Sequence, residues 1–237
     1  MRGPWWAWLA LAALACLLFV RLGLWQWHRG EEREAQSRGF ARGAGTLVDL
    51  EKGATADLAL YQRVRARGAL DTSHQFLIDN RSYRGQAGYE VLTPLLRDGA
   101  ASLLVDRGWV PFSGSRRELP DVSIAAAGSI SLTGRLALLP GAGLAMGHAA
   151  PAAGAWPKVT AFPDMAELAL AVGAPLEPRI LLLDPGAPSG YVRDWRAPGM
   201  APMRHFSYAI QWWSFAALTG VLWALMAWRD RRSGVKA

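Results

Sequence analysis

The sequence predicts an α+β protein in which a two-helix transmembrane hairpin, made of N- and C-terminal spans, encloses one mainly β extramembrane domain with a short helix. Three observations support this fold class. A long apolar run lies near each end of the chain, alternating apolar and polar residues recur between them, and one short amphipathic stretch is bounded by helix-capping residues. We therefore predict transmembrane helices at residues 4–27 and 205–228, an extramembrane domain at 28–204 and a basic tail at 229–237.

The second span is the clearer of the two. Residues 206–228 contain no charged side chain, and 23 helical residues extend roughly 34 Å, which exceeds the hydrocarbon thickness of about 30 Å. Tyr and Trp lie near its ends, as is typical of membrane interfaces. Four basic residues follow it: Arg229, Arg231, Arg232 and Lys236.

The first span is shorter. Its apolar run covers residues 4–20 and continues past Arg21 through residues 22–27, and Arg21 can extend its charge to the membrane interface. A cleaved signal peptide is the alternative, but a small-x-small cleavage site is missing where the apolar region ends. Cys16 is best explained as a small residue that fills space within the membrane.

The basic residues predict the topology. The cluster after the second span favours a cytoplasmic C-terminus, which places both termini in the cytoplasm and the domain in the periplasm of a bacterial inner (cell) membrane protein. The intervening segment is long enough to be translocated despite its arginines. The net charge of +7 is spread along the chain, so we expect membrane lipid or an acidic protein surface, and no nucleic acid, as the partner.

Short strands are predicted throughout the central domain. Arg63, Arg65 and Arg67 alternate with small or apolar residues, as on a strand with one solvated face. Asp98-Gly99 separates two apolar runs and predicts a hairpin. The predicted strands cover residues 61–68, 76–78, 89–96, 102–110, 130–139 and 179–183, and the predicted helix covers 164–172. A mobile loop rich in Gly, Ala and Pro is expected at about 140–157.

Common catalytic patterns are missing from the sequence. It has no Gly-x-Ser-x-Gly, no His-Glu-x-x-His and no Cys-x-x-Cys-His, and its four histidines fit no compact zinc spacing. We therefore predict that the protein is not an enzyme.

Two histidines lie where the apolar runs end on the same side of the membrane. His205 immediately precedes the second run and His28 follows the first. At about 100° per residue, His205 shares a helix face with the following residues, which could receive a flat macrocycle: Tyr208, Ala209, Trp212, Ala216, Gly220 and Trp223. The alternative is that the small residues only allow close helix packing and that the aromatic residues anchor the interface. Gln211, an intramembrane polar residue, favours a functional site.

Several ordered motifs resemble the surfeit locus 1 family of cytochrome c oxidase assembly proteins. They are LGLWQWHR at 22–29, YQRVRARG at 61–68, NRSYRG at 80–85, GYEVLTP at 88–94, LLVDRGWVP at 103–111, LLLDPGAPSGYVRDW at 181–195 and RHFSYAIQWWSFA at 204–216. The resemblance covers nearly the whole chain.

The resemblance implies a factor that assists maturation of the haem–copper oxidase catalytic subunit, and bacterial relatives bind haem a. It implies that His205 is an axial ligand of a transiently bound haem a, so that His205 is also the predicted metal ligand, with Tyr208, Trp212 and Gln211 around the cofactor. His28 as a second ligand is a separate hypothesis from the hairpin geometry.

The implied partners are the catalytic subunit of cytochrome c oxidase, with haem a synthase as a further candidate. Four motif residues of the domain are predicted to bind a partner: Asn80, Arg81, Arg107 and Trp109. Two other functions stay open. One is a scaffold that stabilises oxidase subunits without a cofactor, and the other is a membrane oxidoreductase that acts on the porphyrin side chain.

Overall fold

The computed structural model describes residues 5–43, 46–50, 53–115, 118–125, 128–141, 151, 154–188, 191–197 and 199–233. The chain divides into two compact units, one of Met1–Arg38 with Ala197–Ala237 and one of Gly39–Arg196. Most of the loop predicted at 140–157 lies outside the described residues.

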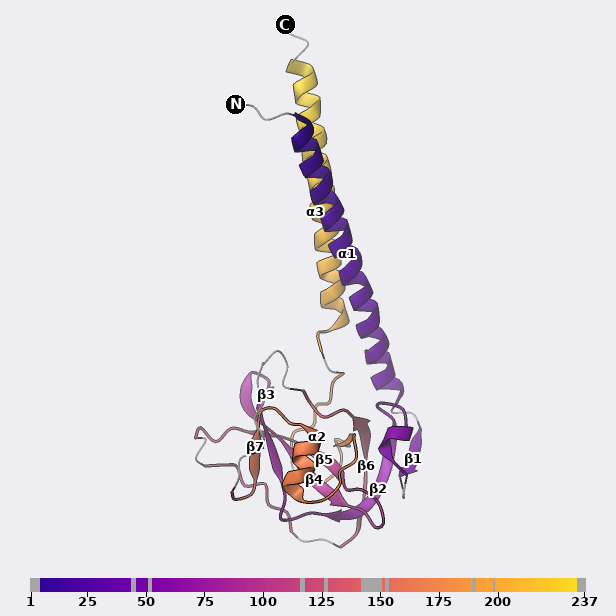
Figure 1. Cartoon of the computed structure of the whole chain (residues 1–237), viewed down its shortest axis with the longest axis vertical. Coiled ribbons are helices and arrows are strands. Elements are labelled where there is room, and N and C mark those ends of the chain that lie inside the picture. Colours follow the sequence, from indigo (N-terminus) through magenta and orange to yellow (C-terminus); the bar gives the residue numbers. More distant parts are fainter. Residues whose placement is uncertain are drawn as a thin grey trace. The chain divides into compact units, whose positions relative to one another are not determined.

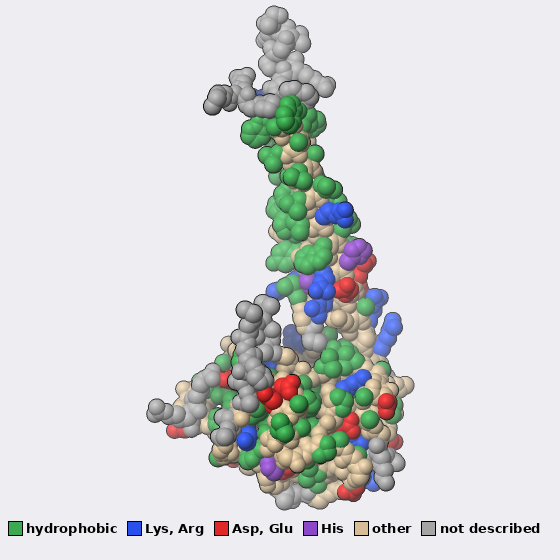
Figure 2. Space-filling model, viewed as in Figure 1, with side chains coloured by type: hydrophobic (Ala, Val, Ile, Leu, Met, Phe, Trp, Pro, Cys, Tyr) green, Lys and Arg blue, Asp and Glu red, His purple; other side chains and the backbone are tan. Residues whose placement is uncertain are grey.

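The first unit is a pair of long helices, α1 (Trp5–Arg42) and α3 (Pro202–Ser233). They lie side by side and antiparallel (Figure 1), with Cys16 beside Ala216 and Gln26 beside His205. Trp6–Arg42 and Pro202–Arg229 are long and apolar enough to cross a membrane, and only 6% of each apolar window is buried. Apolar side chains cover much of the visible surface in the upper part of the pair (Figure 2), whereas the apolar side chains of a core helix would be buried. The two predicted apolar helices are confirmed, and α1 continues without a break beyond residue 27.

The second unit is mainly β and contains one mixed eight-stranded sheet among the described residues. The strands are β1 (Leu47–Leu50), β2 (Arg63–Leu70), β3 (Phe76–Tyr83), β4 (Gln86–Leu96), β5 (Leu103–Pro111), β6 (Ile130–Ala137), β7 (Lys158–Thr160) and β8 (Ile180–Leu183). Their order is β1-β2-β6-β8-β5-β4-β3-β7. An additional β2–β4 pairing closes a ring of five strands, β2-β6-β8-β5-β4, around apolar side chains such as Val64, Leu95 and Leu136.

Local signals explain several of these elements. In β2, Val64 and Ala66 are buried while Arg65 and Arg67 are exposed, so the predicted alternation is confirmed. The turn between β4 and β5 contains Gly99 at a φ of 69°, a conformation that glycine adopts without strain.

The short helices also follow from the sequence. In α2 (Met165–Val172), the Asp164 side chain accepts hydrogen bonds from the backbone N–H groups of Ala166 and Glu167. Gly173 ends α2 in the left-handed conformation. A further 3-10 turn, η1, covers Thr55–Asp57.

Candidate functional site

The seam between α1 and α3 is built from glycines and aromatic rings. A Cβ atom on Gly23 would lie 2.2 Å from Trp213 Nε1, and one on Gly30 would lie 2.5 Å from Phe206 Cε1. These two glycines therefore make room for the aromatic side chains of α3. On α3, Ala209 is fully buried.

His205 lies at this seam and bonds to α1. Its Nδ1 is 2.8 Å from Oε1 of Gln26, and the imidazole is half-buried. An amide oxygen only accepts hydrogen bonds, so Nδ1 carries the proton and Nε2 keeps its lone pair. Histidines that bind metal commonly have this arrangement, in which the second ring nitrogen donates to a fixed acceptor. The donor set therefore fits a haem iron at Nε2.

The aromatic residues predicted around His205 differ in their exposure. Trp212 is half-buried and stacks on Phe19, with ring centroids 5.8 Å apart and planes at 22°. Tyr208 is 47% exposed and Phe215 is 44% exposed, so both offer apolar surface beside the seam. Ala209 is fully buried and Ala216 lies beside Cys16, so these two small residues serve helix packing, as the alternative interpretation expected. Gly220 does not, because it is exposed and a Cβ there would have no neighbour within 4 Å.

Two predicted residues are not brought to His205. Gln211 is exposed, and six helical residues place it about 120° around α3 from His205. The His28 side chain is 72% exposed and pairs with Glu31 of its own helix at 3.2 Å. His28 is two positions after Gln26 in α1, which places the two side chains about 200° apart around the helix. The arrangement gives no support to the hypothesis that His28 and His205 share one site.

Gln26 is the residue that the sequence interpretation missed. It lies in the LGLWQWHR motif and is the polar residue of that motif that faces α3. An amide between apolar and aromatic neighbours was a usable signal, because a polar side chain within a membrane helix needs a partner. Its pairing with His205 depended on the register of two helices 179 residues apart in sequence.

In the β domain, two irregularities flank β4 and aim side chains to one face. The β3–β4 register shifts between Ile78 and Arg81, where Asn80 has a φ of 61°. The β4–β5 register shifts between Glu90 and Leu92, opposite Gly108 at a φ of 119°. Bulges of this kind commonly redirect side chains. Arg81 of β3 lies opposite Gly88 of β4, and Trp109 and Asp106 of β5 lie opposite Glu90 and Leu92 of β4. Because residues 88, 90 and 92 point to the same side of β4, Arg81, Glu90, Asp106 and Trp109 share one face of the sheet.

This face carries a buried charged cluster. Asp106 is 1% exposed, and its Oδ1 accepts a hydrogen bond from the Gly108 N–H at 3.0 Å. Burial and the nearby Glu90 charge raise the pKa of Asp106 well above its ordinary value. Burial also raises the pKa of Glu90, although Arg81, 3.3 Å away, opposes the shift.

The structure corrects part of the predicted partner surface. Arg107 is only 3% exposed, and its guanidinium donates to the Val122 carbonyl at 2.9 Å and lies over the Tyr191 ring at 4.7 Å. Trp109 is also buried and packs against Tyr83, with ring centroids 5.5 Å apart. Both residues therefore stabilise the fold and are not available at the surface.

Asn80 and Arg81 differ from these two. Asn80 is exposed, whereas Arg81 is half-buried and donates to the carbonyls of Pro140 and Gly141 at 3.3 Å. Partner binding by Asn80 and Arg81 stays a prediction.

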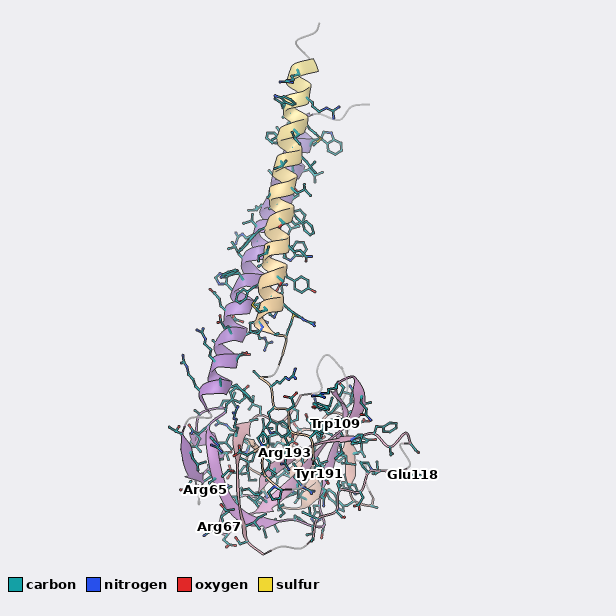
Figure 3. The ribbon with its side chains drawn as sticks, turned by 180° about the vertical axis from the view of Figure 1, so that it is seen from behind. Arg65, Arg67, Trp109, Glu118, Tyr191 and Arg193 are labelled. Atoms are coloured by element: carbon teal, nitrogen blue, oxygen red, sulfur yellow. The ribbon has the colours of Figure 1, made fainter. Side chains whose placement is uncertain are left out.

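Arg193, which was not among the predicted site residues, connects two segments of the domain through hydrogen bonds. Its Nε donates to the Arg107 carbonyl at 2.7 Å, and its Nη1 donates to the carbonyls of Asp184 and Ala187. A side chain on Gly108 would lie 2.7 Å from the Val192 carbonyl, so glycine allows this segment to approach β5. Trp109, Tyr191 and Arg193 lie together in the domain (Figure 3).

Comparison with known families decides the identity. The SURF1 family matches residues 13–217, which include the α1–α3 seam and the whole β domain. The chain belongs to the SURF1 family. Uncharacterized SURF1-like proteins of Mycobacterium bovis and of Mycobacterium tuberculosis are each 32% identical to it over 141 residues. The match covers 54% of this chain and 51% of each relative, so the chain spans about half the length of the curated relatives it matches. SURF1 proteins are known as cytochrome oxidase assembly factors and form no known enzyme class.

Proposed function

We propose that this SURF1 protein assists assembly of a haem–copper cytochrome c oxidase by binding haem a at the membrane and delivering it to the catalytic subunit. The observation that carries the proposal is the hydrogen bond from His205 Nδ1 to Gln26 Oε1, 2.8 Å long. It fixes the tautomer that leaves Nε2 free to bind iron, and it holds the ring in one orientation.

The residues around His205 suit an apolar macrocycle that carries acidic side groups. Tyr208 and Phe215 present exposed aromatic surface on α3. Arg204, exposed and next to His205 in sequence, offers a cation for the propionate groups of a haem. Because Ala209 is buried between the helices, the haem would bind on the exposed side of His205, near Tyr208.

Delivery requires that binding is reversible. Of the two histidines in the described helix pair, only His205 lies at the seam, because His28 is exposed and pairs with Glu31. One axial histidine without a second ligand favours moderate affinity, which would allow the catalytic subunit to take the haem. Haem a is too apolar to move freely through water, so a site at the end of a membrane span would keep it next to its destination.

The proposed topology follows from the charges after α3. The described part of that segment contains Arg229 and Arg232, which favour a cytoplasmic C-terminus. His205 would then lie at the periplasmic end of the pair, in the inner membrane of a bacterium.

A second candidate function is a scaffold that holds oxidase subunits without haem. The observation that favours it is the extent to which aromatic side chains already fill the α1–α3 seam. Trp27 contacts both Phe206 and Trp213, with ring centroids 4.8 and 5.6 Å apart. Such a pair is stable without a cofactor in its seam.

Complementation of a deletion strain distinguishes the two functions. Oxidase activity and membrane haem a content would be measured with the wild type, His205→Ala and His28→Ala, at equal protein levels by immunoblot. His28→Ala is a matched control because His28 lies outside the seam. Haem delivery predicts rescue by the wild type and His28→Ala and poor rescue by His205→Ala. Equal rescue by all three would favour the scaffold.

A further inference from the structure

A groove crosses the outer face of the β domain where β2 and β6 pair. Arg63 lies opposite Arg135, Arg65 opposite Thr133 and Arg67 opposite Ser131. The groove runs between this pair of strands and the turn at residues 184–188, with a volume of about 730 Å³. Its polar lining comprises Arg63, Ser131, Thr133, Arg135 and Asp184. We call it the arginine groove.

The groove continues into a second hollow of about 170 Å³. The two hollows share Arg135, Asp184 and Pro185, and the second adds Arg193 and Trp195. The Trp195 indole donates to the Leu183 carbonyl at 2.7 Å, which fixes one wall. The result is an elongated depression with arginines along it and apolar residues at its side.

The charges in the arginine groove are not balanced. Arg63 pairs with Asp184 at 2.6 Å, but Arg135 contacts only the carbonyl and ring of Phe40 in the described part of the chain. A carbonyl and an aromatic ring do not neutralise a guanidinium charge. In the second hollow, Asp194 is paired with Arg196 at 2.6 Å.

Arg135 also retains hydrogen-bonding capacity. A guanidinium has five N–H groups, and one nitrogen of Arg135 donates to the Phe40 carbonyl at 3.2 Å. Phe40 holds the Arg135 side chain, with the guanidinium 4.6 Å from the ring centre, so little conformational entropy remains to be lost on binding. Arg67 extends the positive charge along β2 (Figure 3), whereas Arg65 is paired with Asp49 at 3.1 Å.

We propose that the arginine groove binds an extended acidic segment of a partner polypeptide. A carboxylate of that segment would pair with Arg135, because a guanidinium binds a carboxylate through two parallel hydrogen bonds. Pro185 and Pro188 would contact its apolar side chains. An elongated recess with apolar walls fits a polypeptide better than the flat surface of a bilayer. The proposal does not depend on haem binding by His205.

The test measures binding of a defined acidic peptide to the full chain. The protein would be placed in nanodiscs of uncharged phosphatidylcholine, and a fluorescein-labelled peptide of alternating Glu and Pro would be followed by anisotropy. A Lys-Pro peptide of the same length is the control ligand. We expect salt-sensitive binding of the acidic peptide alone.

The main variant is Ser131→Glu, which adds a carboxylate to the groove at an exposed position of β6. Thr133→Glu is a second variant, and Ser73→Glu makes the same change as Ser131→Glu on another exposed surface. We expect each groove variant to weaken binding about tenfold, consistent with the loss of one charge-assisted hydrogen bond. Ser73→Glu should bind as the wild type does.

Three results would overturn the proposal. The first is equal binding of the acidic and basic peptides. The second is unchanged affinity in both Ser131→Glu and Thr133→Glu when their circular dichroism matches the wild type. The third is displacement of the peptide by vesicles of phosphatidylglycerol at equal charge, with the same sensitivity to Ser131→Glu, which would identify the groove as a lipid site.

Discussion

At the scale of single residues, the proposed haem binding depends on the protonation and orientation of one imidazole. His205 could present either ring nitrogen outward, and its contact with Gln26 selects Nε2. A glutamine amide is a weaker acceptor than a carboxylate, so it orients the ring without adding negative charge near the membrane. Gln26 is therefore a positioning residue that acts through His205.

Replacement of Gln26 by leucine should weaken haem binding while His205 remains in place. Loss of a hydrogen-bond partner of a metal-binding histidine typically lowers metal affinity by about 10- to 100-fold. Titration of the purified chain with haem, followed by absorbance, gives the affinity. Gln211→Leu is the matched control, because Gln211 is exposed and lies outside the seam. Equal affinities of Gln26→Leu and Gln211→Leu would contradict the role of Gln26.

Asp106 should make the stability of the chain depend on pH. Its pKa is raised in the folded state, so the folded chain keeps a proton that the unfolded chain releases above about pH 4. The stabilisation that protonated Asp106 contributes is complete below the pKa of Asp106 in the unfolded chain. It is lost as the pH rises toward the pKa of Asp106 in the folded chain. We expect the unfolding temperature to fall as the pH rises from about 5 to about 8, and Asp106→Asn to reduce that fall.

Asp121→Asn provides the control for this measurement. Asp121 is exposed, and the backbone N–H of Ser123 lowers its pKa, so it titrates below the pH range of the experiment. Its replacement should leave the pH dependence as it is in the wild type. The unfolding temperature would be followed by near-ultraviolet circular dichroism. If it depended on pH in Asp106→Asn as it does in the wild type, Asp106 would not be the group responsible.

At the scale of elements, glycines determine how closely α1 approaches α3. Gly23 has no space for a Cβ because of Trp213, whereas Gly39, also in α1, has no neighbour within 4 Å of such an atom. Since alanine favours a helix more than glycine does, the two positions should respond in opposite directions to the same substitution.

Gly39→Ala should stabilise the protein by about 0.5–1 kcal/mol, the usual preference of a helix for alanine. Gly23→Ala should instead destabilise it by about 1–3 kcal/mol, because the new methyl group would displace the Trp213 ring. Unfolding by sodium dodecyl sulfate in mixed micelles, followed by far-ultraviolet circular dichroism, gives both values. Stabilisation by Gly23→Ala would mean that the helices do not pack through this glycine.

The elements that could be predicted from sequence are those with strong local patterns. The arginine alternation identified β2, Asp98-Gly99 identified the β4–β5 hairpin, and Asp164 and Gly173 bounded α2. The strands β1 and β7 were not predicted, because they have only four and three residues and each contains a charged one. β8 is also four residues long but entirely apolar, so it was recognised as an apolar run.

The candidate site was harder to predict because it depends on distant contacts. Arg107 was predicted to bind a partner because it lies in a family motif, and its burial follows from a carbonyl and a ring that other segments supply. The pairing of Gln26 with His205 requires the register of α1 against α3. His205 itself was identified by its position before an apolar run and by the family motif.

At the scale of the whole molecule, the chain combines two compact units with different chemistry. The helix pair is apolar outside and holds one oriented imidazole near one end of the spans. The β domain packs around apolar clusters, buries the Arg107 guanidinium and carries an arginine groove on its surface. We infer a division of roles, in which the helix pair holds the cargo and the domain recognises a partner polypeptide.

The most direct test of this account is the absorbance spectrum of the chain purified from cells that make haem a. The wild type should carry a haem a spectrum, His28→Ala should keep it, and His205→Ala should lose most of it at equal protein concentration. The same haem content per chain in His205→Ala as in the wild type would contradict the central claim, that His205 binds the haem iron.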